Sequence, residues 1–172
     1  MLIFLRYSPM PVNFGACLGA AVVSDYFDGV IARRLRVATA GLRRLDSIVD
    51  TVFYGTATFA AWSLYPAVIH RHAVLLIILV ALEFARYVFD LIKFGREASY
   101  HMYSSKMWGL MLFIAFFSLL VYGYSGLLFA AAIIIGIVAD LEGVAISVVL
   151  PVWTHDVPTL FKALEIRNLK RN

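Results

Sequence analysis

Four aspartates, Asp25, Asp28, Asp46 and Asp50, lie in or beside segments that are apolar enough to form membrane helices. A carboxylate at such a depth is costly unless a cation, a proton or water accompanies it. With about 100° of rotation per helical residue, Asp25 and Asp28 share one helix face, and Asp46 and Asp50 lie one turn apart. If residues 34–45 form a turn between two antiparallel helices, we expect the four carboxylates to meet near one membrane surface.

Carboxylate oxygens are hard ligands, which favour magnesium, manganese or calcium over zinc and copper. Magnesium often bridges carboxylates to phosphate groups, so the cluster predicts a phosphorylated substrate. Gly29 and Ala32 share the face of the first two aspartates and leave it without bulky side chains. Arg33 lies at the edge of that face, where its guanidinium could pair with a phosphate.

The spacing of these residues resembles the signature of the CDP-alcohol phosphotransferases, integral membrane enzymes of phospholipid synthesis. The matching positions are Asp25, Asp28, Gly29, Ala32, Arg33, Asp46 and Asp50. The resemblance implies transfer of a substituted phosphate from a CDP-alcohol, usually CDP-diacylglycerol, to a small polar alcohol with release of CMP. It also implies one or two bound divalent ions, Mg²⁺ or Mn²⁺.

The resemblance implies a role for each matching position. The metal ligands are expected to be Asp25, Asp28, Asp46 and Asp50. Asp50 is also expected to act as the general base on the acceptor hydroxyl. The CDP donor is expected to be bound by Asp25, Gly29, Ala32 and Arg33. One position departs from the signature, because Leu42 stands where the family has a glycine, with Gly41 one place early.

Composition predicts an all-α, polytopic membrane protein of one domain, residues 1–172. The chain is 62% hydrophobic and 15% charged, with a mean hydropathy of +0.85, whereas soluble domains are about a quarter charged. About five transmembrane helices are expected, at residues 9–33, 45–65, 73–92, 107–122 and 127–150. Residues 1–8 are too few to span a bilayer, so the first helix of the six-helix family core is expected to be missing or truncated.

The distribution of basic residues predicts the orientation. Twelve of the 15 Lys and Arg lie in residues 33–44, 93–106 and the tail at about 152–172. By the positive-inside rule, the signature then faces the cytoplasm at the cell membrane. The tail is expected to be an amphipathic helix on anionic lipid or a solvated basic segment. No nucleic-acid partner is expected.

Three basic or histidine side chains outside the signature are candidate contacts for the acceptor or a phosphate. Arg86 could bind a phosphate or could pair with Glu83 and Asp90 along its own helix. His101 and Lys106 could contact a headgroup, or Lys106 could be an ordinary interface anchor.

Two further acidic residues are expected inside the fifth span. Asp140 and Glu142 lie about 200° apart on an ideal helix, so they cannot both face one groove. We expect one of them in the polar interior, opposite Arg86, and the other at a helix break near Gly143. Whether they bind substrate or only join helices stays open.

Other features leave alternatives open. Gly15 and Gly19 have a small-xxx-small spacing that allows close helix packing within the chain or a homodimer. The single Cys17 excludes an internal disulfide. A catalytically inactive family member acting as a binding or assembly subunit is indicated by Leu42 and the short N-terminus. A cation-coupled transporter would also bury carboxylates, but it does not explain the glycine, alanine and arginine beside them.

Overall fold

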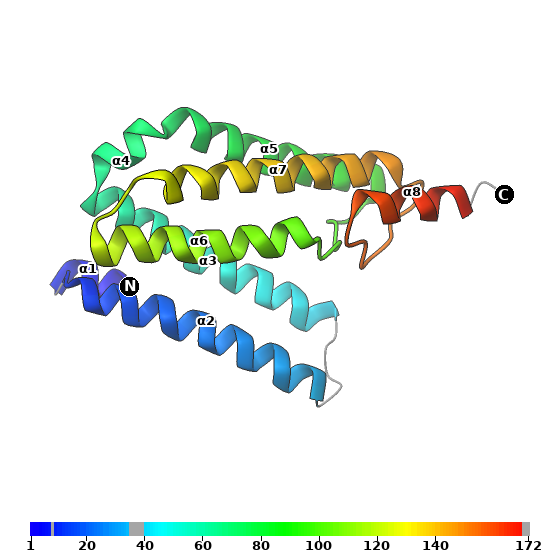
Figure 1. Ribbon diagram of the computed structural model, residues 1–172. Helices are drawn as coiled ribbons and strands as arrows, with labels where there is room; N and C mark the ends of the chain where they lie inside the picture. The colour runs from blue at the N-terminus through cyan, green and yellow to red at the C-terminus, as the bar shows by residue number, and fades with distance from the viewer. Residues whose placement is uncertain (8, 35–39, 170–172) are drawn as a thin grey trace. The chain divides into compact units, whose positions relative to one another are not determined.

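The computed structural model describes residues 1–7, 9–34 and 40–169. Within α2 and α3, the side chains at positions 26, 28, 29, 32, 33, 40–44, 46 and 47 lie outside the described part. The described residues form helices and no strand, which confirms the all-α prediction (Figure 1). The helices are α1 (Leu2–Tyr7), α2 (Pro11–Arg34), α3 (Ala40–Leu64), α4 (Pro66–Arg71), α5 (Ala73–Phe94), α6 (Tyr103–Tyr122), α7 (Leu127–Val149) and α8 (Leu160–Leu169).

Five long helices of the described part, α2, α3, α5, α6 and α7, lie where the five spans were predicted, and the number of membrane spans stays a prediction. The predicted starts were late for α3, which begins at Ala40 rather than 45, and for α6, which begins at Tyr103 rather than 107. In both cases a polar first turn is helical, so loss of hydropathy does not mark the end of the helix. Among the described residues, α6 and α7 are long and apolar enough to cross a membrane by length and composition.

The chain forms two compact units, and each has its own packing. The first comprises residues 1–70 and 113–125. In it, α2 and α3 run in opposite directions (Figure 1). Ala57, Ala60 and Ala61 form a fully buried small-residue face on α3, which permits close helix approach. A Cβ at Gly15 would lie 3.1 Å from Val121, so Gly15 serves packing within the chain. The homodimer stays a prediction.

The second unit comprises residues 71–112 and 126–172. Its centre is the pair α5 and α7, which run in the same direction (Figure 1). Trp108, in the N-terminal half of α6, lies beside Gly136 of α7, and α8 packs on α7. At the end near α8, a buried apolar cluster contains Tyr100, Met102, Ile146, Leu150, Val157 and Ala163. The helical tail predicted by the sequence is therefore partly a packing element, although Phe161 is 83% exposed.

Helix ends in this unit follow local rules. Gly95 closes α5 in the left-handed conformation (φ 68°), and its N–H donates to the carbonyl of Leu91. Glycine adopts this conformation without strain. By contrast, α7 continues without interruption through Gly143 to Val149, so the helix break expected there is wrong.

Gly136 of α7 is required for close packing of three helices. A Cβ at this position would lie 2.6 Å from Trp108 Nε1 of α6 and 2.9 Å from Leu79 Cδ1 of α5. Gly136→Ala should therefore lower the free energy of unfolding by about 1–3 kcal/mol, as overpacking does. Gly109→Ala is the matched control, because nothing lies within 4 Å of its new Cβ. Thermal unfolding in detergent should show a lower midpoint only for the first variant; equal midpoints would contradict this packing.

Candidate active site

Two of the signature carboxylates have described side chains, and they come from different helices. Asp25 lies on α2 and Asp50 on α3, and both are exposed. The phenol of Tyr54, one turn after Asp50, lies within electrostatic range of both carboxylates. Asp25 on α2 and Asp50 on α3 thus both act on one side chain.

Tyr54 is held in place by aromatic neighbours. Its ring stacks on Phe116, with centroids 6.1 Å apart, and meets the edge of Phe53 at 5.5 Å. The sequence reasoning did not select this residue. The signal that could have found it is its i+4 spacing from Asp50, which places both side chains on one face of α3.

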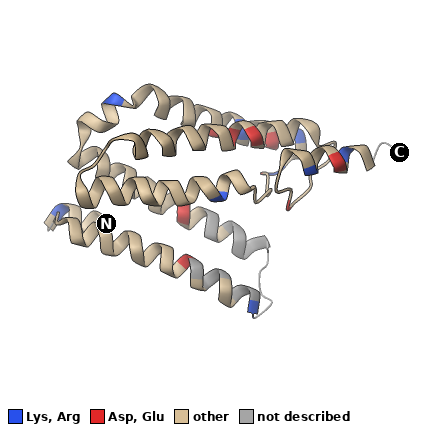
Figure 2. Ribbon diagram, viewed as in Figure 1, with Lys and Arg blue, Asp and Glu red and all other residues tan. Residues whose placement is uncertain are grey.

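The remaining signature side chains, those of Asp28, Gly29, Ala32, Arg33 and Asp46, lie outside the described part of the chain. Figure 2 shows acidic positions on both α2 and α3. Among the described side chains, no group of three His, Cys, Asp or Glu residues could hold a metal ion. The donor chemistry of Asp25 and Asp50 nevertheless fits a hard divalent ion, because both supply carboxylate oxygens within range of a common neighbour.

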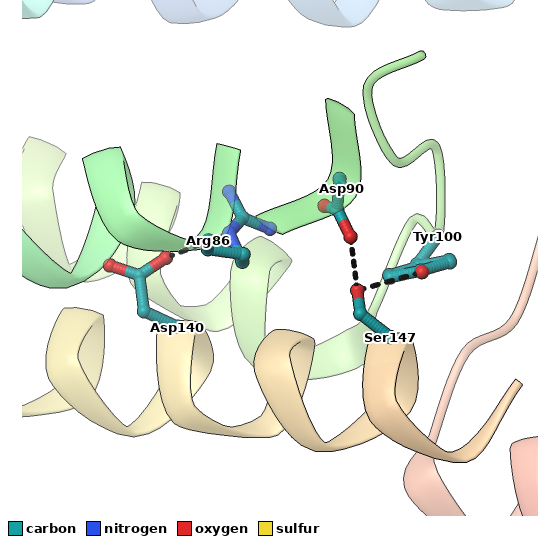
Figure 3. A network of polar contacts seen from close by, with 5 residues as sticks. All are labelled: Arg86, Asp90, Tyr100, Asp140 and Ser147. Atoms are coloured by element: carbon teal, nitrogen blue, oxygen red, sulfur yellow. Dashed lines mark hydrogen bonds and ion pairs between the residues drawn. The ribbon is translucent and has the colours of Figure 1, made fainter. Parts of the chain in front are cut away.

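Arg86 pairs across helices in the second unit. Its Nε lies 3.3 Å from Oδ1 of Asp140 on α7 (Figure 3). The Asp140 side chain is only 3% exposed, whereas that of Arg86 is 25% exposed. Glu142, on another side of α7, accepts a hydrogen bond from the backbone N–H of Leu160 (3.2 Å). The two acidic residues therefore face different partners, as their angular separation requires.

Asp90 belongs to a second buried contact network (Figure 3). The hydroxyl of Ser147 donates to Asp90 Oδ1 at 2.5 Å and lies 2.9 Å from the hydroxyl of Tyr100. Lys93 donates to the carbonyls of Ser147 and Val148, which places a cation at the C-terminal end of α7. These contacts attach the segment between α5 and α6 to α7.

The phenol of Tyr100 is 3% exposed and outside the helices. Burial, together with the charge of Asp90, raises its pKa, although the hydrogen bond with Ser147 acts in the opposite direction. A raised pKa means that the folded state holds the proton more tightly than the unfolded state. The resulting stability is present below the ordinary value of 10.0 and is lost as pH rises above it.

Tyr100→Phe should lower the free energy of unfolding by about 1 kcal/mol at neutral pH, because one hydrogen bond is lost. The difference from the unaltered protein should shrink above pH 10, where only the unaltered protein has this phenol to ionise. Denaturant unfolding at neutral and alkaline pH measures both effects. Tyr103→Phe is the control, since Tyr103 is 61% exposed. A pH-independent difference would contradict this role of the phenol.

His101 and Lys106 line one surface pocket of about 200 Å³ in the second unit, together with Tyr100, Tyr103, Asp156 and Pro158. His101 and Asp156 both have positive φ (52° and 55°). His101 Nε2 lies 3.8 Å from Asp156 Oδ1, and Lys106 lies over the ring of Tyr103. The structure thus brings these two predicted residues together, while Arg86 has its own ion pair with Asp140.

A family model described as CDP-alcohol phosphatidyltransferase matches residues 1–149. Searches of curated proteins and of solved structures gave no significant match. The matched region includes the five long helices and the seven matching signature positions. With the apolar helices α6 and α7, it indicates a membrane protein. The chain therefore belongs to the CDP-alcohol phosphatidyltransferase family, whose activity is transfer of a phosphatidyl group from a CDP-alcohol to an alcohol.

Proposed function

We propose that this chain is a phospholipid-synthesis enzyme that transfers a substituted phosphate to an alcohol hydroxyl and releases CMP. The donor is CDP-diacylglycerol, and the signature faces the cytoplasm at the cell membrane. The observation that supports the proposal is that Asp25 on α2 and Asp50 on α3 both lie within electrostatic range of Tyr54. The family match over residues 1–149 supports the same activity.

The proposed mechanism uses the residues of the signature. Asp50 accepts the proton of the acceptor hydroxyl, whose oxygen then attacks the phosphorus of the phosphatidyl group. The bond from that phosphorus to the CMP oxygen breaks, and CMP leaves. Arg33 pairs with a phosphate of the donor, and Gly29 and Ala32 leave room for the nucleotide beside Asp25.

The metal ligands of the proposal are Asp25, Asp28, Asp46 and Asp50. When bound, one or two Mg²⁺ or Mn²⁺ ions would neutralise charge on the pyrophosphate of the donor. The four carboxylates would hold such ions. Asp50 would thus be a metal ligand as well as the general base.

The acceptor is proposed only as a class, a small polar alcohol. Arg86, His101 and Lys106 are candidate contacts for it, and their basic character favours an acceptor that carries a phosphate. Glycerol phosphate, inositol phosphate, serine and a lipid hydroxyl are the compounds to compare.

Purified protein in lipid vesicles should release CMP from CDP-diacylglycerol when Mg²⁺ or Mn²⁺ and a pool of these alcohols are present. Removal of the metal by a chelator should reduce release at least about tenfold, because charge on the pyrophosphate is then not neutralised. Restored Mg²⁺ should recover the rate, and the mass of the lipid product should name the acceptor. Release that is equally fast with the chelator would contradict the metal role.

A catalytically inactive family member is the second candidate, because Leu42 replaces the signature glycine. It would bind divalent metal or CDP-alcohol but would not release CMP with any donor or acceptor. Leu42→Gly separates the two cases, since recovery of turnover in this variant would identify the leucine as the cause.

A further inference from the structure

Four buried polar atoms in the second unit have no hydrogen-bond partner among the described residues. They are Arg86 Nε, Ser104 Oγ, Trp108 Nε1 and Asp140 Oδ2. The approach of Arg86 to Asp140 Oδ1 at 3.3 Å is an ion-pair contact, which leaves Oδ2 of the same carboxylate unpartnered. A buried polar group without a partner costs about 1–3 kcal/mol, and ordered water often supplies the missing contact.

The packing of α6 against α7 determines how far along the two helices each of these atoms lies. A Cβ at Gly136 would lie 2.6 Å from Trp108 Nε1, and one at Gly143 would lie 3.3 Å from Met102 Cε. Residue numbers thus fall along α6 as they rise along α7, so the two segments are antiparallel here. Residues that lie opposite one another on the two segments can therefore be identified from their numbers.

Ser104 lies between Met102 and Trp108 in the sequence, and Asp140 lies between Gly136 and Gly143. We therefore infer that Ser104 and Asp140 lie at a similar height along the two segments. A helical side chain leans toward the N-terminal end of its helix. The carboxylate of Asp140 therefore lies over the turn that begins at Gly136, where the indole N–H of Trp108 is located. Figure 3 shows the second carboxylate oxygen of Asp140 on the side away from Arg86.

The chemistry of these groups selects a ligand type. The Trp108 indole can only donate a hydrogen bond, the Asp140 carboxylate accepts, and the Ser104 hydroxyl can do either. A cation would be repelled by the N–H donor, and an anion would be repelled by the carboxylate. A neutral hydroxyl group can accept from the indole and donate to the carboxylate. A buried water usually has about three such partners.

We propose that Ser104, Trp108 and Asp140 form a buried binding site for one neutral hydroxyl, that of a water molecule or of a small alcohol. The site joins α6 to α7 beside the Arg86–Asp140 ion pair. It uses none of the signature aspartates and does not depend on the transferase activity.

Nuclear magnetic resonance of the full chain with ¹⁵N-labelled tryptophan tests the site. The chain has three tryptophans, and Trp108→Phe assigns the Trp108 indole signal. We expect a nuclear Overhauser cross-peak between the Trp108 indole proton and water, with the sign of a long-lived contact. Trp62 is the internal control for contact with bulk water, because it is 55% exposed.

Ser104→Ala and the double variant Arg86→Met/Asp140→Leu distinguish a cross-peak to a bound hydroxyl from a cross-peak to exchangeable protons of the protein. The cross-peak should persist in Ser104→Ala, where the indole and the carboxylate still hold the ligand, and in the matched control Ser105→Ala. It should be lost in the double variant Arg86→Met/Asp140→Leu, which removes the acceptor. Unchanged signals of the other two tryptophans report that each variant is folded.

Added glycerol distinguishes the source of the hydroxyl. A water cross-peak that glycerol does not alter identifies a bound water, and its replacement by a cross-peak to the glycerol CH protons identifies an alcohol. Either result supports the site. Absence of both cross-peaks, loss of the cross-peak in Ser104→Ala, or its persistence in the double variant would overturn the proposal.

Discussion

Asp50→Asn should reduce the rate of CMP release by roughly two to four orders of magnitude, the usual range for a positioned acid or base. The amide has nearly the same shape as the carboxylate but cannot take the proton of the acceptor hydroxyl. Asp50 is exposed on α3, so the replacement should not disturb packing. The measurement is CMP release from CDP-diacylglycerol with saturating Mg²⁺, at equal amounts of protein in lipid.

The control for this variant is Glu165→Gln, which also converts one exposed carboxylate to an amide. Glu165 lies on α8 and pairs with Lys162 (2.9 Å) on the same helix. Surface ion pairs of this kind contribute little to stability, so CMP release should be unchanged. Turnover of Asp50→Asn close to that of the unaltered protein would remove Asp50 from its catalytic role. Loss of rate in both variants would point to a general effect of charge.

Arg86→Met should lower the free energy of unfolding by about 3 kcal/mol, because removing one partner of a buried ion pair leaves the other charge uncompensated. Asp140 is 2% exposed, so bulk solvent cannot screen its charge. Methionine keeps most of the apolar stem that packs over Gly143, where a Cβ would lie 2.8 Å from Arg86 Cδ. Unfolding by denaturant in detergent micelles measures the effect.

A double variant, Arg86→Met/Asp140→Leu, tests whether the missing charge is the cause. Replacing both partners of a buried pair by apolar residues is often neutral or stabilising, so the double variant should recover most of the lost stability. Arg96→Met is the matched control, since Arg96 is exposed and lies 4.9 Å from the ring centroid of Trp153. A double variant no more stable than Arg86→Met would show that the ion pair is not what stabilises this region.

The sequence predicted the five long helices correctly because each is specified locally. Long apolar segments separated by glycine and proline determine where helices exist, as at Pro66, Gly95 and Gly123. Helix ends were predicted less well, because a polar turn such as the start of α6 can be helical without being apolar. Gly143 was misjudged as a break. Its lack of a side chain serves the approach of Arg86 instead.

The partners of the charged residues could not be obtained in the same way. From their spacing, Arg86 could pair with Glu83 and Asp90 on its own helix. In the structure Arg86 instead contacts Asp140. Asp90 contacts Ser147, 57 positions away. More than one acidic residue lies three or four positions from Arg86 on α5. Which contact forms depends on the register of α5 against α7. The sequence did predict that one acidic residue of the fifth span lies opposite Arg86, and the structure identifies it as Asp140.

By itself, the amino-acid sequence determined the helical class of this protein, the type of ligand atoms it offers and its resemblance to one family. Those properties depend on composition and on spacing within about 26 residues, where helix geometry relates positions directly. The tertiary structure alone decided that Asp25 and Asp50 both act on Tyr54, and that Asp140 pairs with Arg86. Such contacts depend on how separate helices pack, because an electrostatic or hydrogen-bond energy is set by distances between segments that the chain itself leaves far apart.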